Sequence, residues 1–434
     1  MIFEQIKKKL YFPLAAYFRF FAKIRIKRWH PKIIVVTGSN GKTTLLHLLE
    51  SQIGEKAKFS HHANSAYGVP FDILDLHRKS FALTEWFDLF LQAPGNAFKK
   101  PPREKLYVVE SDCDRSGEGK FLAEFLRPEV VLWTSVSRTH SMNFDHLVTP
   151  SVISSDQGES RDLFATVDEA IAYEYGYFLE YCKKLAVING DAQLQVSQVK
   201  RTKAHIKIIT KEKYLEKYSV EKEKTVFHID GKSYTFSSLL PEEMCYAIEM
   251  CRLAVKQCDL PFDTTFSKLV LPPGRSSLFP GLKDTTLVDS TYNANLSSII
   301  AMLTMFAKFP AKKKIVVVGD MMELGAKEQE EHEQLGEFLT QMNLDKILLV
   351  GPRTKKYTLS KIKTNNAHAF LSGKEAVAYL EKNISGGEAI LFKGSQSLLL
   401  EGMIEKLLKN TSDLEKLPRR GIFWDQRRNK LGYS

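Results

Sequence analysis

One short segment near the N-terminus constrains the fold more than any other part of the chain. Residues 35–44 read VVTGSNGKTT, and they lie between a β-branched run and a helical stretch, TTLLHLLESQIG. A glycine-rich loop in this position lets backbone amides approach phosphate oxygens, and the following helix N-terminus adds a favourable dipole. Lys42 would contact the β- and γ-phosphates, and Thr43 or Thr44 would offer a hydroxyl to Mg²⁺. The predicted nucleotide-binding residues are Gly38, Ser39, Asn40, Gly41, Lys42, Thr43 and Thr44.

Buried apolar runs alternate with helical stretches along the rest of the chain, the pattern of a doubly wound α/β sheet. PPGR at residues 272–275 interrupts this pattern, which then restarts. We therefore expect an α/β protein with a central P-loop ATPase domain over residues 31–272, built on a mainly parallel sheet, and a smaller Rossmann-like domain over residues 273–409. The basic tail, residues 410–434, is expected to be an extended wrap or a loose end. The expected strands lie in residues 33–38, 105–111, 129–136, 184–190, 285–290, 313–320, 345–351 and 388–394.

Charge and cysteine usage limit the class of protein. The net charge of +11 favours anionic partners such as nucleotides or a membrane surface. The basic residues are spread out and no aromatic-basic recognition motif accompanies them, so we expect no nucleic-acid partner. The five cysteines form no CxxC pair, which is typical of a reduced compartment. We therefore expect a cytoplasmic protein.

Residues 1–30 form a separate basic and aromatic segment. Cationic side chains interrupt its apolar run, so the run is too short to span a bilayer, which needs about 20 residues. Phe18, Phe21 and Ile24 recur at helical spacing with cations between them. This pattern is typical of a helix on an anionic membrane surface, here the inner face of the membrane. A helix packed on the protein's own surface is the equal alternative.

The loop TGSNGKTT resembles the TGTNGKT loop of the Mur ligases and the folylpolyglutamate synthetases. Further matches to the Mur ligase family follow in order: NSAYGVP at residues 64–70, Glu110 at a strand end, His140 in TSVSRTHSMNFD, NGD at residues 189–191 and GR at residues 274–275. The resemblance implies that Thr43, Glu110 and His140 are Mg²⁺ ligands. It also implies that Arg275 reaches ATP from the domain boundary. A carboxylate suits Mg²⁺, whereas a lone histidine after a strand is more often structural.

Three motifs in the second domain resemble the MurF branch of the same family. They are DSTYNAN at residues 289–295, GDMMELG at residues 319–325 and KGSQS at residues 393–397. The resemblance implies that Asp289 and Tyr292 bind nucleotide. The residues expected to face the incoming amine substrate are Asn293, Asn295, Lys393 and Ser395. The expected catalytic residues are Lys42, Glu110, His140 and Lys393.

Two of the departures from the family pattern bear on the metal site and the uridine site. The family often has a carbamylated lysine that holds Mg²⁺, and Glu174 falls near that position here. Glu174 could supply the same carboxylate as a metal ligand, or it could be a plain surface residue. The segment before the phosphate loop is also shorter than the usual UDP-binding domain, so the uridine site is expected to be missing or replaced.

The resemblance implies an ATP- and Mg²⁺-dependent carbon–nitrogen ligase. Such an enzyme would convert a carboxylate to an acyl phosphate and transfer the acyl group to an amino acid or dipeptide amine. Cell-wall peptidoglycan precursor synthesis is the first expectation, with a carboxylate-bearing peptide precursor as partner. Two alternatives stay open. One is a related ligase for another carboxylate, such as a polyglutamyl or membrane-linked acceptor, and the other is a non-catalytic nucleotide-binding scaffold.

Overall fold

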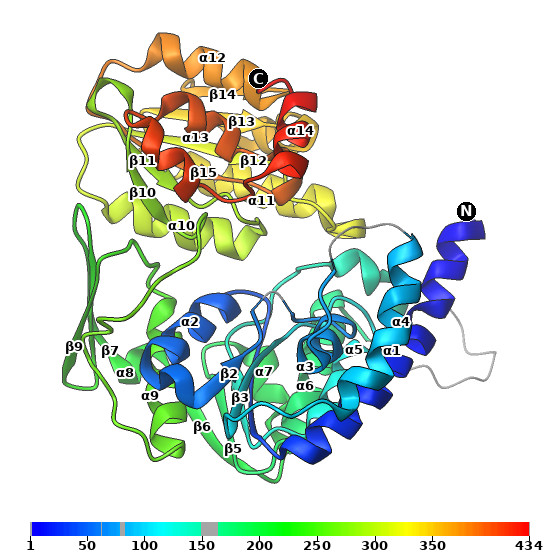
Figure 1. Cartoon of the computed structure of the whole chain (residues 1–434). Helices are drawn as coiled ribbons and strands as arrows, with labels where there is room; N and C mark the ends of the chain where they lie inside the picture. The colour runs from blue at the N-terminus through cyan, green and yellow to red at the C-terminus, as the bar shows by residue number, and fades with distance from the viewer. Residues whose placement is uncertain (1, 62, 79–82, 149–163, 434) are drawn as a thin grey trace.

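The computed structural model describes residues 2–61, 63–78, 83–148 and 164–433, which form two α/β domains lying one above the other in Figure 1. In the described part of the first domain, six strands form one parallel sheet in the order β2-β3-β1-β4-β5-β6. This sheet confirms the predicted doubly wound fold. Its strands are β1 Lys32–Thr37, β2 Ala57–Phe59, β3 Leu106–Ser111, β4 Val130–Trp133, β5 Leu185–Asn189 and β6 His205–Ile209.

Helices cover both faces of this sheet because its strands are apolar on both sides. Ile33 and Val35 of β1 pack into the core on one face, and Ile34 and Val36 pack into the core on the other. The first face is covered by α1, α3, α4, α5 and α6, and the second by α2 and α9. The helices are α1 Ile2–Trp29, α2 Lys42–Ile53, α3 Gly68–Leu74, α4 Leu83–Phe98, α5 Glu118–Leu126, α6 Val167–Glu180, α7 Gln193–Ser197, α8 Lys211–Tyr214 and α9 Met244–Gln257.

A small antiparallel sheet, absent from the sequence predictions, follows β6 and α8. Its strands are β7 Leu215–Val220, β8 Thr225–Ile229 and β9 Lys232–Phe236. Asp230 and Gly231 make the two-residue turn between β8 and β9, with φ values of 50° and 71°. Asp-Gly is a favoured pair in such turns because both positions need a positive φ. The sequence therefore contained a hairpin signal at this position.

The second domain is built on another sheet, whose described strands run in the order β10-β11-β15-β12-β13-β14. The sheet is parallel except at the edge, where β10 pairs antiparallel with β11. Helices α10 and α11 cover one face, and α12 and α13 cover the other, as a Rossmann-like domain requires. The elements are β10 Ser277–Pro280, β11 Thr286–Asp289, α10 Leu296–Lys308, β12 Lys314–Gly319, α11 Glu328–Thr340, β13 Lys346–Val350, β14 Ala367–Phe370, α12 Gly373–Asn383, β15 Ala389–Lys393 and α13 Glu401–Leu407.

Helix α1 packs one face against the protein itself. Ala15, Phe18, Ala22 and Trp29 are buried, and the rings of Phe18 and Phe90 stack at 4.9 Å between centroids. Of the two alternatives for residues 1–30, packing of a helix on the protein's own surface is therefore correct for the face that carries these buried residues. None of the described helices is long and apolar enough to cross a membrane.

The C-terminal tail is folded onto the second domain rather than loose. It contains α14, Ile422–Lys430, and Tyr433 after this helix is buried. A Cβ on Gly373 would lie 1.8 Å from the Tyr433 hydroxyl oxygen, and one on Gly402 would lie 2.7 Å from its ring. The two glycines therefore make room for Tyr433. The alternative of a loose end is wrong because apolar packing holds this segment in place.

Candidate active site

The phosphate loop joins β1 to α2 and lies against the end of β4. Gly38 and Gly41 have φ values of 120° and 82°, and a Cβ at Gly38 would lie 2.5 Å from Oγ1 of Thr134. The Thr134 hydroxyl donates to the Asn40 carbonyl over 2.6 Å. Glycine at position 38 is therefore required by the close approach of the loop to the sheet. The loop leads directly into the N-terminus of α2, where phosphate is favoured.

Lys42 is the buried cation of this loop. Its Nζ lies 2.7 Å from Oδ2 of Asp112 and donates to the Gly38 carbonyl over 2.5 Å. Tyr175 donates its hydroxyl to the other Asp112 oxygen over 2.7 Å. Although burial opposes ionisation, the Lys42 ammonium and these hydrogen bonds hold the pKa of Asp112 below its usual range. Asp112 was not a predicted site residue. Its place two residues after Glu110, beyond the carboxyl end of β3, is the signal that would have indicated it.

Thr43 and Glu110 meet beside the phosphate loop. Oγ1 of Thr43 donates to Oε2 of Glu110 over 2.9 Å, and the Glu110 amide donates to the Ser60 hydroxyl oxygen over 2.9 Å. Thr44 is buried, so Thr43 is the hydroxyl that faces the carboxylate. A hydroxyl and a carboxylate are the hard oxygen donors that Mg²⁺ prefers. The residues present therefore fit a Mg²⁺ ion next to nucleotide phosphates.

His140 lies where the two domains meet. Its Nε2 is 3.4 Å from Oδ1 of Asp114 in the first domain, and its Nδ1 contacts the carboxylate of Glu323 in the second. Burial lowers the pKa of His140, but the hydrogen bond to Glu323 and the charge of Asp114 outweigh burial and raise the pKa to about 9. The imidazole is thus a cation between two carboxylates. Metal binding needs the neutral ring, so the Mg²⁺ role of His140 stays a prediction.

Glu174 contacts backbone amides at the start of α5. This α6 side chain is buried, and its carboxylate oxygens accept from the amides of Gly117 over 2.7 Å and Gly119 over 3.0 Å. These amides lie at the N-terminus of α5, where a carboxylate complements the helix dipole. Glu174 is therefore not the plain surface residue of the second alternative. The structure gives Glu174 a helix-capping contact, and its metal-ligand role stays a prediction.

Arg275, Asp289 and Lys393 come together near the ends of β11 and β15. Nζ of Lys393 donates to the Asn293 carbonyl over 2.8 Å, and the Arg275 guanidinium lies over the Tyr292 ring, 4.2 Å from its centroid. Burial and the Arg275 charge lower the pKa of Lys393 to about 7. Burial raises the pKa of Asp289 to about 6. Ionisable groups perturbed in this way are typical of a ligand-binding or catalytic site.

Three buried polar atoms of this second-domain group have no hydrogen-bond partner among the described residues. They are Nε of Arg275, Oδ2 of Asp289 and Oγ of Ser395. Buried polar atoms are normally paired, so an unpaired set in one place indicates that a polar ligand completes it. All three belong to residues predicted to contact the nucleotide or the amine substrate. The residues present therefore fit ATP and a polar second substrate.

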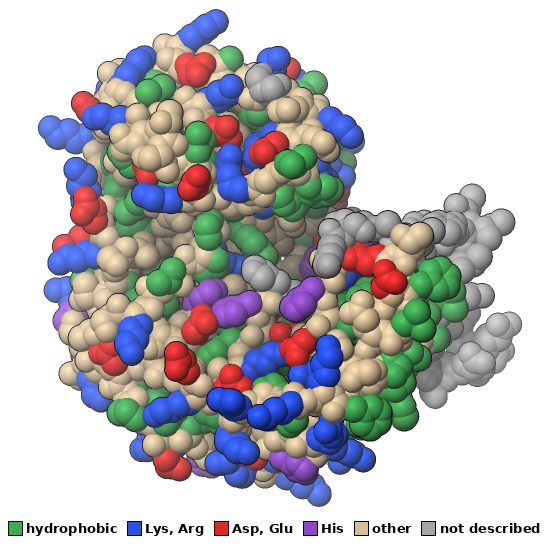
Figure 2. All heavy atoms as spheres, in the orientation of Figure 1, with side chains coloured by type: hydrophobic (Ala, Val, Ile, Leu, Met, Phe, Trp, Pro, Cys, Tyr) green, Lys and Arg blue, Asp and Glu red, His purple; other side chains and the backbone are tan. Residues whose placement is uncertain are grey.

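Contacts across the domain interface bring these groups to the phosphate loop. Asn295, the N-cap of α10, donates to Oδ1 of Asn40 over 2.9 Å. Arg138 lies in the segment after β4. Its guanidinium forms ion pairs with the carboxylates of Glu330 at 3.0 Å and Glu331 at 2.9 Å, both on α11. Figure 2 shows a recess between the two domains on this side of the molecule. The two sets of predicted site residues thus face each other across the interface. Arg138 was not predicted, because its partners lie far away in the sequence and two of them belong to the other domain.

We expect Asp289→Asn to stabilise the protein at about pH 8 but not at about pH 4. Burial raises the pKa of Asp289 to about 6, so between pH 3.8 and 6 the folded state binds more protons than the unfolded state. Stability therefore falls as the pH rises through this window, and the ionised carboxylate costs up to about 3 kcal/mol above it. Urea denaturation at the two pH values measures the difference. If Asp289→Asn changed the free energy of unfolding equally at the two pH values, the raised pKa of Asp289 would be contradicted.

Comparison with known proteins follows the same division of the chain. Residues 274–396 match the family model described as Mur ligase, glutamate ligase domain. The chain is 26% identical over 395 residues to the UDP-N-acetylmuramoyl-tripeptide–D-alanyl-D-alanine ligase of Synechocystis sp., covering 88% of this chain and 76% of that protein. It is 23% identical over 414 residues to the ligase of the same name from Buchnera aphidicola, covering 89% of this chain and 78% of that protein.

Solved structures show the same fold. The MurF ligase of Thermotoga maritima in complex with ADP has a TM-score of 0.70 and 21% identity, covering 90% of this chain and 82% of that one. MurF from Acinetobacter baumannii has a TM-score of 0.72 and 19% identity, covering 92% and 81%. The sequence matches and the shared fold confirm the resemblance read from the motifs. The chain is therefore similar to Mur ligases over 88–89% of its length, and its match to the glutamate ligase domain lies at residues 274–396.

Proposed function

We propose that this protein is a cytoplasmic, ATP- and Mg²⁺-dependent ligase of peptidoglycan precursor synthesis. It joins the carboxylate of a UDP-N-acetylmuramoyl-tripeptide to the amine of D-alanyl-D-alanine. One observation carries the proposal. The phosphate-loop residues of the first domain, one half-site, lie opposite a second half-site in the second domain, in which buried polar atoms have no partner. Two substrates held in this way can react as one bound assembly. The half-sites are Lys42, Thr43 and Glu110 on one side and Arg275, Asp289, Lys393 and Ser395 on the other.

Amide formation first needs the carboxylate oxygen made into part of a leaving group. A carboxylate oxygen attacks the γ-phosphorus of ATP, the bond from that phosphorus to the β–γ bridging oxygen breaks, and ADP leaves as the acyl phosphate forms. The amine nitrogen then attacks the acyl carbon. The carbon–oxygen bond to phosphate breaks, and phosphate and a proton are released. Bound Mg²⁺ would supply positive charge at the phosphates.

The chain's own residues have distinct tasks in this scheme. Lys42 stabilises the charge that accumulates when carboxylate and phosphate meet, giving up part of its contact with Asp112 to do so. Lys393 has a pKa of about 7, so a fraction is neutral near neutral pH and can accept the proton that the amine loses. The Asn40–Asn295 contact keeps the second domain closed over the loop, which excludes water from the acyl phosphate.

The two other functions make different demands on the same fold. A ligase for a polyglutamyl or membrane-linked carboxylate would keep both half-sites and differ only in the acceptor. A non-catalytic scaffold needs the phosphate loop but not a buried lysine with a lowered pKa beside unpaired polar atoms. The second half-site therefore favours an enzyme over a scaffold.

The test is phosphate release from ATP with UDP-N-acetylmuramoyl-tripeptide and D-alanyl-D-alanine, with mass spectrometry of the product. We expect release to require both substrates and to yield the pentapeptide. Nucleotide binding with no stimulation by either substrate would exclude this substrate pair. Stimulation by the dipeptide together with another carboxylate would instead identify the alternative ligase.

We also propose peripheral contact with an anionic membrane through an apolar patch on the first domain. The patch consists of Phe20 on α1 and Phe87, Leu91 and Phe98 on α4, which are 60%, 73%, 79% and 63% exposed. Figure 2 shows hydrophobic side chains gathered along the edge of the molecule where α4 lies in Figure 1. Exposed cations lie on α1 and just after α4, with the Arg28 guanidinium 5.9 Å from the Phe98 ring centroid, and they suit anionic headgroups. These cations are Lys23, Lys27, Arg28, Lys99 and Lys100.

Point substitutions test this contact, because deleting α1 would remove Phe18 and Trp29 from the core. We expect the double variant Phe87→Ser and Leu91→Ser to lose most co-sedimentation with phosphatidylglycerol vesicles and to keep its substrate-dependent release of phosphate from ATP. Ile422→Ser, on α14 of the other domain and 79% exposed, is the matched control and is expected to bind normally. Equal binding by the double variant and the control would exclude the patch as a membrane contact.

A further inference from the structure

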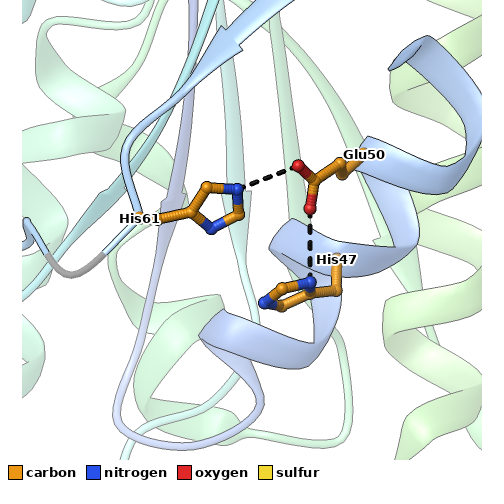
Figure 3. Close-up of side chains that lie close together, drawn as sticks. All are labelled: His47, Glu50 and His61. Atoms are coloured by element: carbon orange, nitrogen blue, oxygen red, sulfur yellow. Dashed lines mark hydrogen bonds and ion pairs between the residues drawn. The ribbon is translucent and has the colours of Figure 1, made fainter. Parts of the chain in front are cut away.

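A histidine–glutamate–histidine cluster lies at the surface of the first domain, apart from the nucleotide-binding residues (Figure 3). His47 and Glu50 are three residues apart on α2, and His61 follows β2. Oε1 of Glu50 is 2.9 Å from Nε2 of His61, and Oε2 of Glu50 is 3.3 Å from Nδ1 of His47. The ligand atoms of the three residues all lie within 4.8 Å of one another. In Figure 3 both imidazoles turn a nitrogen toward the same carboxylate.

The donor set matches the chemistry of divalent transition metals. Two imidazole nitrogens and one carboxylate with an open position are a common set for Zn²⁺, whose bonds to such atoms are about 2.0–2.1 Å. Ligand atoms around a four-coordinate ion with these bonds are about 3.3 Å apart. The ligand atoms of the three residues lie within 4.8 Å of one another, so small side-chain rotations would bring them to that spacing. The side chains of His47, Glu50 and His61 are 18%, 39% and 37% exposed, so an ion and a completing water can reach them.

We propose that His47, Glu50 and His61 bind one divalent transition-metal ion of the Zn²⁺ class. Mg²⁺ prefers oxygen ligands, so the donor set separates this site from the Thr43–Glu110 pair. The proposal does not depend on the substrates of the ligase. The competing explanation is a simple one, in which Glu50 accepts hydrogen bonds from both imidazoles and no metal binds.

The site would tie α2 to the segment that supports Glu110. His61 directly follows Ser60, whose hydroxyl oxygen accepts from the Glu110 amide over 2.9 Å. In the same segment, the Asn64 carbonyl accepts from the Asp112 amide over 2.8 Å. A metal bond to His61 would therefore fix this segment against the helix that begins at the phosphate loop. The expected effect is structural support of the Mg²⁺-binding carboxylate, not direct participation in the reaction.

Cobalt titration of the full-length protein without nucleotide tests the site. We expect one Co²⁺ per chain, seen as visible absorption bands of a four-coordinate site that disappear when Zn²⁺ is added. His61→Ala and Glu50→Gln are each expected to weaken Co²⁺ binding by at least about 10-fold, since loss of a supporting residue alone can cost 10- to 100-fold. Zn²⁺ is expected to raise the Tm of the unsubstituted protein but not of His61→Ala.

Two control variants locate the signal. His205→Ala removes an exposed histidine on β6 and is expected to leave the Co²⁺ spectrum unchanged. His140→Ala is also expected to retain the spectrum, which separates the cluster from the domain interface. The proposal is overturned if no stoichiometric Co²⁺ binds. It is equally overturned if both His61→Ala and Glu50→Gln keep the spectrum, or if His140→Ala abolishes it. Because no ATP is present, these outcomes are independent of the ligase activity.

Discussion

Lys42→Ala is expected to lower kcat for ADP formation by about 10²–10³-fold, the usual effect of removing one preorganised group that stabilises developing charge. The Nζ of Lys42 is at the centre of the phosphate loop and is buried with Asp112 at 2.7 Å. No other lysine was found in the loop that could replace it. The measurement is ADP formation with saturating substrates, followed over several hours to reach low rates.

Removing Lys42 also leaves the Asp112 carboxylate buried without its cation, which destabilises by about 3–5 kcal/mol. Activity loss could then reflect unfolding. The double variant Lys42→Ala with Asp112→Asn removes both charges and is the control for stability. We expect it to regain most of the lost Tm and none of the activity. Recovery of activity together with Tm would contradict the role of Lys42 at the phosphates.

Arg419→Ala is expected to lower the free energy of unfolding of the second domain by about 3 kcal/mol, because it leaves the buried Glu401 carboxylate with only the more distant Arg428 guanidinium, 3.9 Å away. Arg419 binds both oxygens of Glu401 at 2.6 Å, and their side chains are 6% and 0% exposed. The same guanidinium donates to the Thr291 carbonyl over 2.8 Å and to the Tyr292 carbonyl over 3.1 Å. The folded tail thereby holds the segment that follows Asp289.

The neighbouring residue supplies a matched control. Arg420 pairs with Glu405 at 2.9 Å, but these side chains are 27% and 33% exposed, so Arg420→Ala is expected to cost about 0–1 kcal/mol. Urea denaturation of both variants, with nucleotide binding measured in parallel, gives the comparison. Equal destabilisation by the two substitutions would show that burial of the Arg419–Glu401 pair does not control the stability of this domain.

Local sequence patterns were sufficient to predict the four central strands of each main sheet and the phosphate loop, whereas the edge strands β2, β6, β10 and β14 were missed. Ile33, Ile34, Val35 and Val36 are apolar at successive positions, as a strand buried on both faces requires, and GSNGKTT supplies the turn and the helix start. The hairpin at residues 225–236 was missed, although its Asp-Gly pair was visible. The resemblance to the Mur ligase family was likewise identifiable from short motifs in the right order, and the comparisons confirm this resemblance.

Pairings between distant segments were beyond the sequence. Lys42 with Asp112, His140 with Glu323 and His47 with His61 each join residues whose contact depends on how separate elements pack. Glu174 illustrates the reason: its residue type allowed a metal ligand or a surface carboxylate, whereas packing of α6 against α5 made it a helix cap. The sequence by itself determined which elements form and which residues can do chemistry. Only the tertiary structure decided their partners and charge states, because burial and neighbouring charges set both.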